Sequence, residues 1–250
     1  MKNYSTLQIQ KEKDVATIFL HRPEKKNAIN IQMVNDLTDA LDTIEDTKEI
    51  KFLILRSKES LFCSGLDLED VTSKNPPDIY GFQKWEKMCH RIENLNKITI
   101  ASIEGECIGG GFQLVLLCDI RLATTRAKFA FNEVRNAFLP GLATYRLAKY
   151  VGLGKAKQLM MGDSLDARDA LHWGLVNQVC EPENMLEIIQ QNLNNHSSLP
   201  LPAWTLARRL MNECYSSPYE NFLGHFLAAQ HRAINLEDFQ KVAQQQQGKK

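Results

Sequence analysis

Short apolar runs alternate with amphipathic segments along the first 180 residues of the chain. Residues 15–20 and 98–103 are apolar and rich in β-branched side chains, which is typical of buried strands. Residues 31–45 instead repeat apolar side chains at helical spacing, and Asn30 before them is a residue type that caps helices. The repeated side chains are Met33, Leu37, Leu41 and Ile44. We therefore expect an α/β core in which helical crossovers join the strands.

The same patterns predict the remaining elements. Further strands are expected at residues 4–10, 52–55, 61–64, 120–124, 129–131 and 176–179. Further helices are expected at residues 82–94, 112–117, 145–151, 155–161 and 167–173. Residues 72–80 contain adjacent prolines and are expected to form an exposed loop. Beyond Glu183 the pattern is mainly helical, which predicts a carboxy-terminal helical subdomain.

Composition and charge narrow the class of protein. Thirty basic residues balance thirty acidic ones, which argues against a nucleic-acid partner. No apolar run approaches the roughly 20 residues of a membrane-spanning helix. The first ten residues also lack the apolar segment of a signal peptide. The six cysteines show no CxxC or other metal-ligand spacing. We expect a cytoplasmic protein with reduced thiols, no metal site and no membrane contact.

Two glycine turns are the strongest candidates for chemistry. Gly109, Gly110 and Gly111 precede an apolar helix, and Gly65 precedes Leu66 after another apolar stretch. The glycines either let a helix pack tightly on a strand or bring backbone N–H groups close to a ligand. If neighbouring parallel strands end at the same edge, the two turns lie side by side. One N–H from each turn would then form an oxyanion hole for a thioester or ester carbonyl.

Other common catalytic motifs are missing from the sequence. There is no GxxxxGK[ST], no GxGxxG after a strand and no GxSxG. These absences count against nucleotide hydrolysis, dinucleotide redox chemistry and the usual serine hydrolases.

Five segments together resemble the enoyl-CoA hydratase/isomerase (crotonase) superfamily. They are HRPEKKNAIN, LFCSGLDL, IEGECIGGGFQLVLLCDIRLAT, FAFNEVRNAFLP and GLVNQV, in the family's order and spacing. The resemblance implies a spiral of ββα units in residues 1–182 and a helical region for oligomerisation and pocket covering in residues 183–250. It also implies a homotrimer or hexamer. The substrate would be an acyl thioester of coenzyme A or of a carrier protein's phosphopantetheine, with no other cofactor.

The same resemblance implies positions for the site. By motif position, the oxyanion donors are the N–H groups of Leu66 and Gly110. The segment that lines the adenine and pantetheine end of coenzyme A corresponds to Lys25, Lys26, Asn27 and Ala28. Its two lysines can pair with phosphate, although exposed lysines are often merely solvated.

The catalytic carboxylates differ from the family's hydratase pattern. Those hydratases carry two glutamates, and the matching positions here are Gln113 and Glu133. A glutamine can hold a water by hydrogen bonds but cannot exchange a proton with it near neutral pH. Glu133 is expected in an apolar pocket that raises its pKa and suits it to proton transfer, or else as a surface ion-pair partner. The expected walls of that pocket are Phe129, Phe131 and Phe138.

A single carboxylate supports more than one reaction. We predict a hydro-lyase, a hydratase or dehydratase of fatty acid metabolism or of polyketide β-branching, ahead of a Δ3,Δ2-enoyl-CoA isomerase. The opening motif and the short loop at residues 140–152 favour the branching dehydratases, although the isomerases that resemble this chain have a short loop as well. A non-catalytic structural member is the alternative from another class. A decarboxylase variant would use Lys74 with His225 or His231, whereas Asp67 is expected to cap the first glycine turn.

Overall fold

The computed structural model of the chain describes residues 2–71 and 78–247, and within them six strands form the main sheet. Their order is β1-β2-β3-β4-β6-β9. Their bounds are β1 Leu7–Glu12, β2 Val15–Leu20, β3 Phe52–Ser57, β4 Ile98–Ile103, β6 Ile120–Thr124 and β9 Gln178–Cys180. The first two strands form an antiparallel hairpin, and every later strand is parallel to its neighbour. The predicted α/β core with crossovers is therefore confirmed.

Both faces of this sheet are buried. Phe52 and Ile54 of β3 point to one face and pack with Met185 and Ile189 of α7 (Met185–His196). Alternate residues such as Leu53 belong to the larger core on the opposite face. Because side chains alternate along a strand, a strand covered on both faces needs an unbroken apolar run. This explains why the central strands were recognisable in the sequence.

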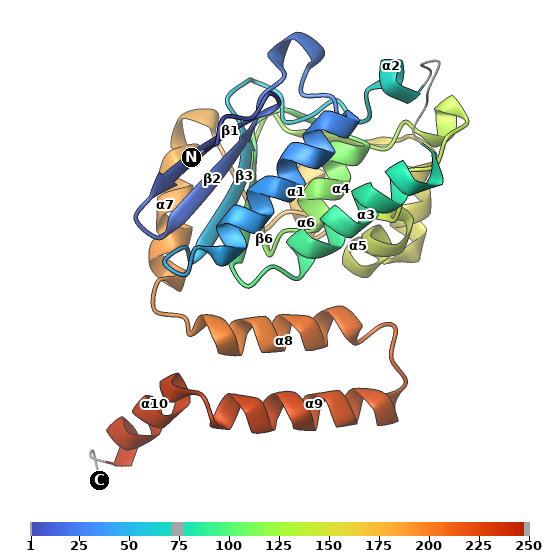
Figure 1. Cartoon of the computed structure of the whole chain (residues 1–250). Helices are drawn as coiled ribbons and strands as arrows, with labels where there is room; N and C mark the ends of the chain where they lie inside the picture. The colour runs from blue at the N-terminus through green and yellow to red at the C-terminus, as the bar shows by residue number, and fades with distance from the viewer. Residues whose placement is uncertain (1, 72–77, 248–250) are drawn as a thin grey trace.

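Helices cover the second face of the sheet (Figure 1). They are α1 Ile31–Asp46, α3 Ile79–Glu93, α4 Gly110–Leu116, α5 Ala143–Met160 and α6 Ala167–His172. Asn30 caps α1 as predicted, because its side chain accepts a hydrogen bond from the N–H of Met33 at 2.9 Å. The apolar positions predicted for α1 are all buried.

Several elements differ from the sequence-based expectation. The segment at residues 61–64 is not a strand, and Cys63 makes only an isolated bridge to Cys107. Helix α3 begins at Ile79, because the Asp78 side chain accepts from the N–H groups of Tyr80 and Gly81. Helix α5 spans both helices expected at 145–161, with a non-helical backbone at Gly152. Of the loop expected at 72–80, residues 72–77 lie outside the described residues.

A small second sheet lies beside the glycine-rich segment. Its strands are β5 Glu106–Ile108, β7 Lys128–Ala130 and β8 Ser164–Asp166, in that order. β5 pairs with β7 in parallel, and β7 pairs with β8 in antiparallel. No sequence pattern predicted β8, because its three residues, Ser-Leu-Asp, are too few to show an alternating pattern.

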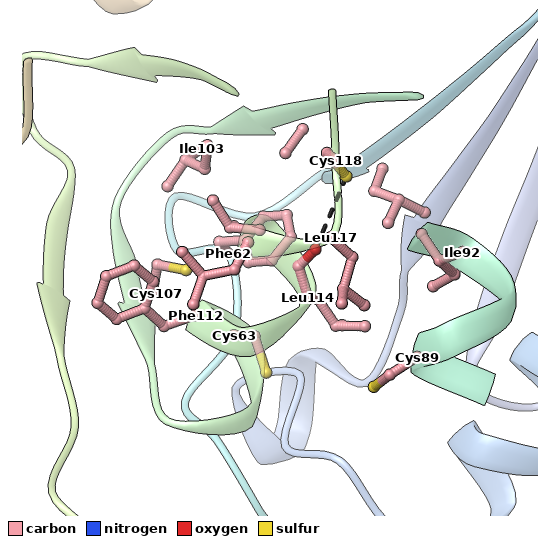
Figure 2. Close-up of a cluster of buried hydrophobic side chains, with 14 of the residues drawn as sticks. Phe62, Cys63, Cys89, Ile92, Ile103, Cys107, Phe112, Leu114, Leu117 and Cys118 are labelled. Atoms are coloured by element: carbon pink, nitrogen blue, oxygen red, sulfur yellow. Dashed lines mark hydrogen bonds between the residues drawn. The ribbon is translucent and has the colours of Figure 1, made fainter. Parts of the chain in front are cut away.

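Four buried cysteines lie in the core around α4. Figure 2 shows the thiols of Cys63, Cys89, Cys107 and Cys118 among the side chains that pack on this helix. Burial raises the pKa of the Cys63 and Cys118 thiols to about 12. A thiol that does not ionise is a poor nucleophile, so these cysteines act as small apolar side chains.

The carboxy-terminal region is helical, as expected. It comprises α8 Leu201–Glu213, α9 Tyr219–Ile234 and α10 Glu237–Gln247. Helix α7, also after residue 182, packs directly on the main sheet, and Leu201 and Trp204 of α8 pack against the same apolar cluster. Helices α9 and α10 lie farther from the sheet (Figure 1). Large apolar side chains of α9, including Phe226 and Leu227, are exposed. The homotrimer or hexamer implied by the resemblance stays a prediction. None of the described helices is long and apolar enough to cross a membrane.

One buried ion pair attaches α8 to the sheet. The guanidinium of Arg208 donates to Asp119 at 2.9 Å and to the carbonyl oxygen of Lys97 at 3.0 Å. Asp119 also accepts from the N–H and the hydroxyl of Thr99 at 2.9 and 3.0 Å. Both ionic side chains are more than nine-tenths buried. The orientation of α8 therefore depends on these polar contacts.

Removing the carboxylate of this pair should destabilise the fold. We expect Asp119→Ala to lower the free energy of unfolding by about 3–5 kcal/mol, because Arg208 would remain buried without its partner. Urea unfolding followed by circular dichroism measures this loss. Arg209→Ala, at the exposed neighbouring position, should change the free energy by less than about 0.5 kcal/mol. Equal losses in the two variants would contradict the assignment.

Candidate active site

A cavity of about 460 Å³ opens where the two glycine turns meet helices α1 and α3. The start of α1, one side of α3, the start of α4 and the loop at residues 137–142 contribute to its wall. Most of its lining is apolar, with Trp85, Phe82, Phe138 and Leu142 as large members. The titratable side chains among its described lining residues are Asp70, Glu86 and Glu133. All three are acidic.

The two glycine turns lie against each other, as the sequence predicted. A Cβ atom added to Gly65 would lie 3.3 Å from the carbonyl oxygen of Ile108 and 3.8 Å from the Cα of Gly109. A Cβ atom on Gly110 would lie 3.9 Å from the Leu66 side chain. Gly65 also has a φ of +98°, a backbone conformation that favours glycine. Neither turn therefore tolerates a side chain without moving its neighbour.

The predicted backbone donors both line the cavity. Leu66 lies in a parallel bridge with Ile29, in which the N–H of Ile29 donates to Gly65 and the N–H of Asp67 donates to Ile29. This pattern leaves the N–H of Leu66 without a hydrogen bond to any described residue. The N–H of Gly110, in the first turn of α4, likewise donates to no described residue. Two N–H groups are thus available at one wall of the cavity.

Each of the three consecutive glycines makes a separate close approach. A Cβ atom on Gly109, whose φ is +53°, would lie 2.1 Å from Oε1 of Glu133. A Cβ atom on Gly111 would lie 2.5 Å from the Cβ of Cys63. Gly111 therefore serves core packing, whereas Gly109 makes room for a cavity-lining carboxyl group. The two roles left open by the sequence apply to different residues of the same run.

Glu133 reaches the cavity from the start of a 3₁₀ turn, Val134–Asn136. Its Oε2 atom is buried and has no hydrogen-bond partner among the described residues. Burial raises the pKa of this carboxyl group, because the charged form loses its water. No described cation forms an ion pair with it, so the alternative of a surface ion pair is wrong.

The aromatic wall predicted around Glu133 is only partly correct. Phe138 lines the cavity and contacts Phe82, with ring centroids 5.7 Å apart. Phe129 and Phe131 are fully buried and pack on Phe112 at 5.2 and 4.6 Å. They lie in the core behind the site, because the alternation of the β7 segment turns them away from the cavity.

Gln113 lines the cavity, but its amide is engaged within the protein. Its side chain lies in α4 and only 1% of the residue is exposed. The Nε2 group donates to both carboxylate oxygens of Glu86, at 3.0 and 3.1 Å, and lies 3.5 Å from the thiol of Cys89. The Oε1 atom accepts from the N–H of Ala143 at 3.2 Å. The amide therefore connects α3, α4 and α5.

Glu86 is the site residue that the sequence analysis missed. Its carboxylate accepts from the N–H of Leu142 at 2.9 Å and from Arg146 at 3.2 Å, in addition to Gln113. Arg146 is almost fully buried and also pairs with Glu93 at 3.2 Å. Although burial acts to lower the pKa of Arg146, Glu93 and Glu86 hold it above its ordinary value. The guanidinium stays charged beside the cavity.

The segment predicted to bind coenzyme A lies beside the cavity, not in its described lining. Asn27 is fully buried, and its side chain donates to the hydroxyl of Ser57 at 2.8 Å. Ala28 is buried as well. Lys25 pairs with a glutamate of α2 (Leu68–Val71) at 2.5 Å, while Lys26 is exposed. Asn27 and Ala28 thus support the turn, and Lys26 keeps an accessible charge.

The remaining candidates lie elsewhere. Asp67 pairs with the buried guanidinium of Arg22 at 2.9 Å and accepts from a backbone N–H at the start of α2, so its structural role is confirmed. His225 pairs with a glutamate of α8 at 2.7 Å. Neither His225 nor His231 belongs to the described lining of the cavity, and Lys74 lies outside the described residues.

Comparison with known proteins agrees with this arrangement. The family model for enoyl-CoA hydratase/isomerase matches residues 10–248. The chain is 31% identical over 214 residues to a crotonyl-CoA hydratase of Syntrophomonas wolfei, covering 84% of this chain and 82% of that protein. It is 32% identical over 208 residues to a short-chain-enoyl-CoA hydratase of Clostridium acetobutylicum, covering 82% and 80%. It superposes on an enoyl-CoA hydratase of Bacillus anthracis with a TM-score of 0.89 and 25% identity, over 98% and 97% of the two chains. The chain therefore belongs to the enoyl-CoA hydratase/isomerase family and has the crotonase fold that its motifs predict.

Proposed function

We propose that this protein hydrates the double bond of a 2-enoyl-CoA thioester whose acyl chain is uncharged, with Glu133 as the proton-transfer group. The observation that carries this proposal is the Glu133 carboxyl group, buried against Gly109 beside the two N–H groups of Leu66 and Gly110 that donate to no described residue. The family membership and the hydratase names of the relatives support the reaction class.

The geometry suits addition of water to an enoyl thioester. When water adds at C3, electron density moves from the double bond to the thioester oxygen, which becomes an enolate. Two backbone N–H groups directed at that oxygen stabilise this charge, and removal of one such donor typically costs about 3–4 kcal/mol in a rate. Burial raises the pKa of the Glu133 carboxyl group, and this shift toward the protonated form suits the group to deliver a proton to C2.

The electrostatics of the cavity favour an uncharged acyl group. Among the described residues that line the cavity, all the titratable ones are acidic, and most of the others are apolar. The acyl group of a polyketide β-branching dehydratase carries a carboxylate, which would lie among like charges there. Burying such an unpaired charge is strongly unfavourable. We therefore place an apolar acyl chain ahead of a branched dicarboxylic one, and the names of the crotonyl-CoA and short-chain-enoyl-CoA hydratase relatives favour coenzyme A over a carrier protein.

The phosphates of coenzyme A would lie near the turn before α1. We assign Lys26 to these phosphates, because its turn adjoins the cavity-lining residues Ile29 and Asn30. Lys25 can join it once its exposed ion pair is broken. An exposed ion pair is weak, so a phosphate can replace the glutamate at little cost.

Replacing the Glu133 carboxyl group by an amide should abolish most of the turnover. We expect Glu133→Gln to lower kcat with crotonyl-CoA by about 10²–10⁴-fold with little change in KM, because the amide cannot transfer a proton. Loss of the enoyl-thioester absorbance measures the rate, and Glu24→Gln, at an exposed position, is the control.

Unchanged turnover in Glu133→Gln would overturn the proposed function. A wild-type protein that converts only 3-enoyl-CoA would instead be an isomerase. A protein inactive on crotonyl-, 3-enoyl- and 3-hydroxyacyl-CoA would support the non-catalytic alternative.

The same substitution should stabilise the fold at neutral and alkaline pH. Burial raises the pKa of Glu133 in the folded protein above the ordinary 4.5 of a glutamate, so the native state binds this proton more tightly than the unfolded state. Ionised Glu133 therefore destabilises the fold at pH values above its raised pKa. This destabilisation fades as the pH falls below 4.5, where the carboxyl group is protonated in the folded and the unfolded state. We expect Glu133→Gln to raise Tm at pH 8 by more than at pH 4, measured by thermal denaturation. An equal shift at both pH values would contradict the buried, ionisable state.

Charge on the acyl chain should decide the choice of substrate. We expect kcat/KM for crotonyl-CoA to exceed that for 3-methylglutaconyl-CoA by at least about 100-fold, because the second substrate brings a carboxylate into an acidic, apolar cavity. Parallel assays with the coenzyme A and carrier-protein thioesters of both acyl groups measure this preference. A preference for the dicarboxylic acyl group on the carrier protein would favour the branching dehydratase instead.

A further inference from the structure

We propose that Glu86, and not Gln113, holds and deprotonates the water that adds at C3, with Gln113 and Arg146 positioning the Glu86 carboxylate. This inference rests on the proposed hydration reaction. It assigns the second carboxyl group of the reaction to a helix, α3, that the sequence motifs do not mark.

The hydrogen bonds of Glu86 leave room for one more donor. An ionised carboxylate has about four acceptor sites. Three groups donate to this one: the N–H of Leu142 to Oε1, the guanidinium of Arg146 to Oε2, and the amide of Gln113, which lies 3.0 and 3.1 Å from the two oxygens and is shared between them. The side chain is 20% exposed and lines the cavity. A water in the cavity can therefore donate to the remaining acceptor site.

Gln113 offers no comparable site. Its amide group donates to Glu86 and lies near Cys89, and its oxygen accepts from Ala143. With 1% of the residue exposed, Gln113 is a supporting group between helices. The amide is also the correct partner for an anion, because a glutamate at position 113 would put two carboxylates about 3 Å apart.

Arg146 leaves the cluster with a net negative charge. Its guanidinium is shared between Glu86 and Glu93, at 3.2 Å from each. The formal charges of two carboxylates and one guanidinium sum to one negative charge, so Arg146 does not fully neutralise Glu86 and Glu93. The single guanidinium is therefore divided between two carboxyl groups, and Glu86 lines a largely apolar cavity as a hydrogen-bond acceptor.

The proposed step balances in atoms and electrons. The water oxygen forms a bond to C3 while one of its protons passes to Glu86. The electron pair of the double bond moves to C2 and the thioester oxygen, and C2 takes the proton of Glu133. Glu86 then releases its proton to solvent and Glu133 regains one. The net change is the addition of one water across C2 and C3.

The test compares two carboxylates of the same helix. Glu86 and Glu93 both lie in α3, both pair with Arg146, and both have side chains that are 20% exposed, but only Glu86 belongs to the described lining of the cavity. We expect Glu86→Gln to lower kcat for crotonyl-CoA hydration by about 10²–10⁴-fold. Glu93→Gln should stay within about tenfold of the wild type, and circular dichroism and Tm report whether each variant folds.

A second readout separates chemistry from structure. Exchange of the C2 protons of butyryl-CoA in D₂O, followed by NMR, needs Glu133 and the two N–H groups but no water at C3. Glu86→Gln should retain this exchange within about tenfold, while Glu133→Gln should lose both reactions. Gln113→Met should lower hydration through Glu86, so the double variant Gln113→Met/Glu86→Gln should be no slower than Glu86→Gln alone.

Three results would overturn the inference. They are unimpaired hydration in Glu86→Gln, an equal loss of hydration in Glu86→Gln and Glu93→Gln, and a loss of C2 exchange that parallels the loss of hydration in Glu86→Gln. Activity retained in Glu133→Gln would count against the proposed function itself, so the two failures can be told apart.

Discussion

The contact between the Glu133 carboxyl group and Gly109 is the constraint on which the site depends. A Cβ atom at Gly109 would lie 2.1 Å from Oε1 of Glu133, so only glycine allows the carboxyl group to come so close. The same backbone approach brings Gly110 beside Leu66. Packing at Gly111 against Cys63 then fixes the start of α4 on the neighbouring turn. The Glu133 carboxyl group and two backbone donors are thereby held together by rigid parts of the fold.

The charged groups of the cavity differ in how their burial is compensated. Glu133 has a buried oxygen with no partner, so burial favours its protonated form. Glu86, in contrast, accepts hydrogen bonds from a backbone N–H, an amide and a guanidinium. One cavity therefore holds a carboxyl group with a buried, unpartnered oxygen and a second one held by three donor groups.

The scaffold explains why this arrangement can be held in place. β3 and β4 are neighbouring parallel strands, and each leads toward one of the two glycine turns. The sheet is packed on both faces, with α7 on one side and α1, α3 and α4 on the other. Arg146 adds a polar connection between α3 and α5 beside the cavity. The site therefore lies where several independently packed elements meet.

Much of the fold was predictable because its signals are local. Buried parallel strands need continuous apolar runs, and a helix such as α1 shows both its period and its capping Asn30 within a few residues. Predictions failed where few residues carry the signal, as in β8. They also failed where a distant contact sets the conformation, as at Cys63, whose N–H donates to the carbonyl of Glu106.

The sequence by itself determined the glycine turns and, through the motifs of the family resemblance, predicted Leu66, Gly110 and Glu133 as neighbours in one site, because these residues lie in motifs with fixed spacing. Only the tertiary structure decided what surrounds them. Glu86 follows the buried Trp85 in α3 and, from the sequence, looks like an ordinary surface charge. Its partners Gln113 and Arg146 are 27 and 60 positions away. A carboxylate becomes part of a site only when the folded chain removes its water and supplies hydrogen-bond donors. Because these donors are distant in the sequence, no local sequence pattern predicts them.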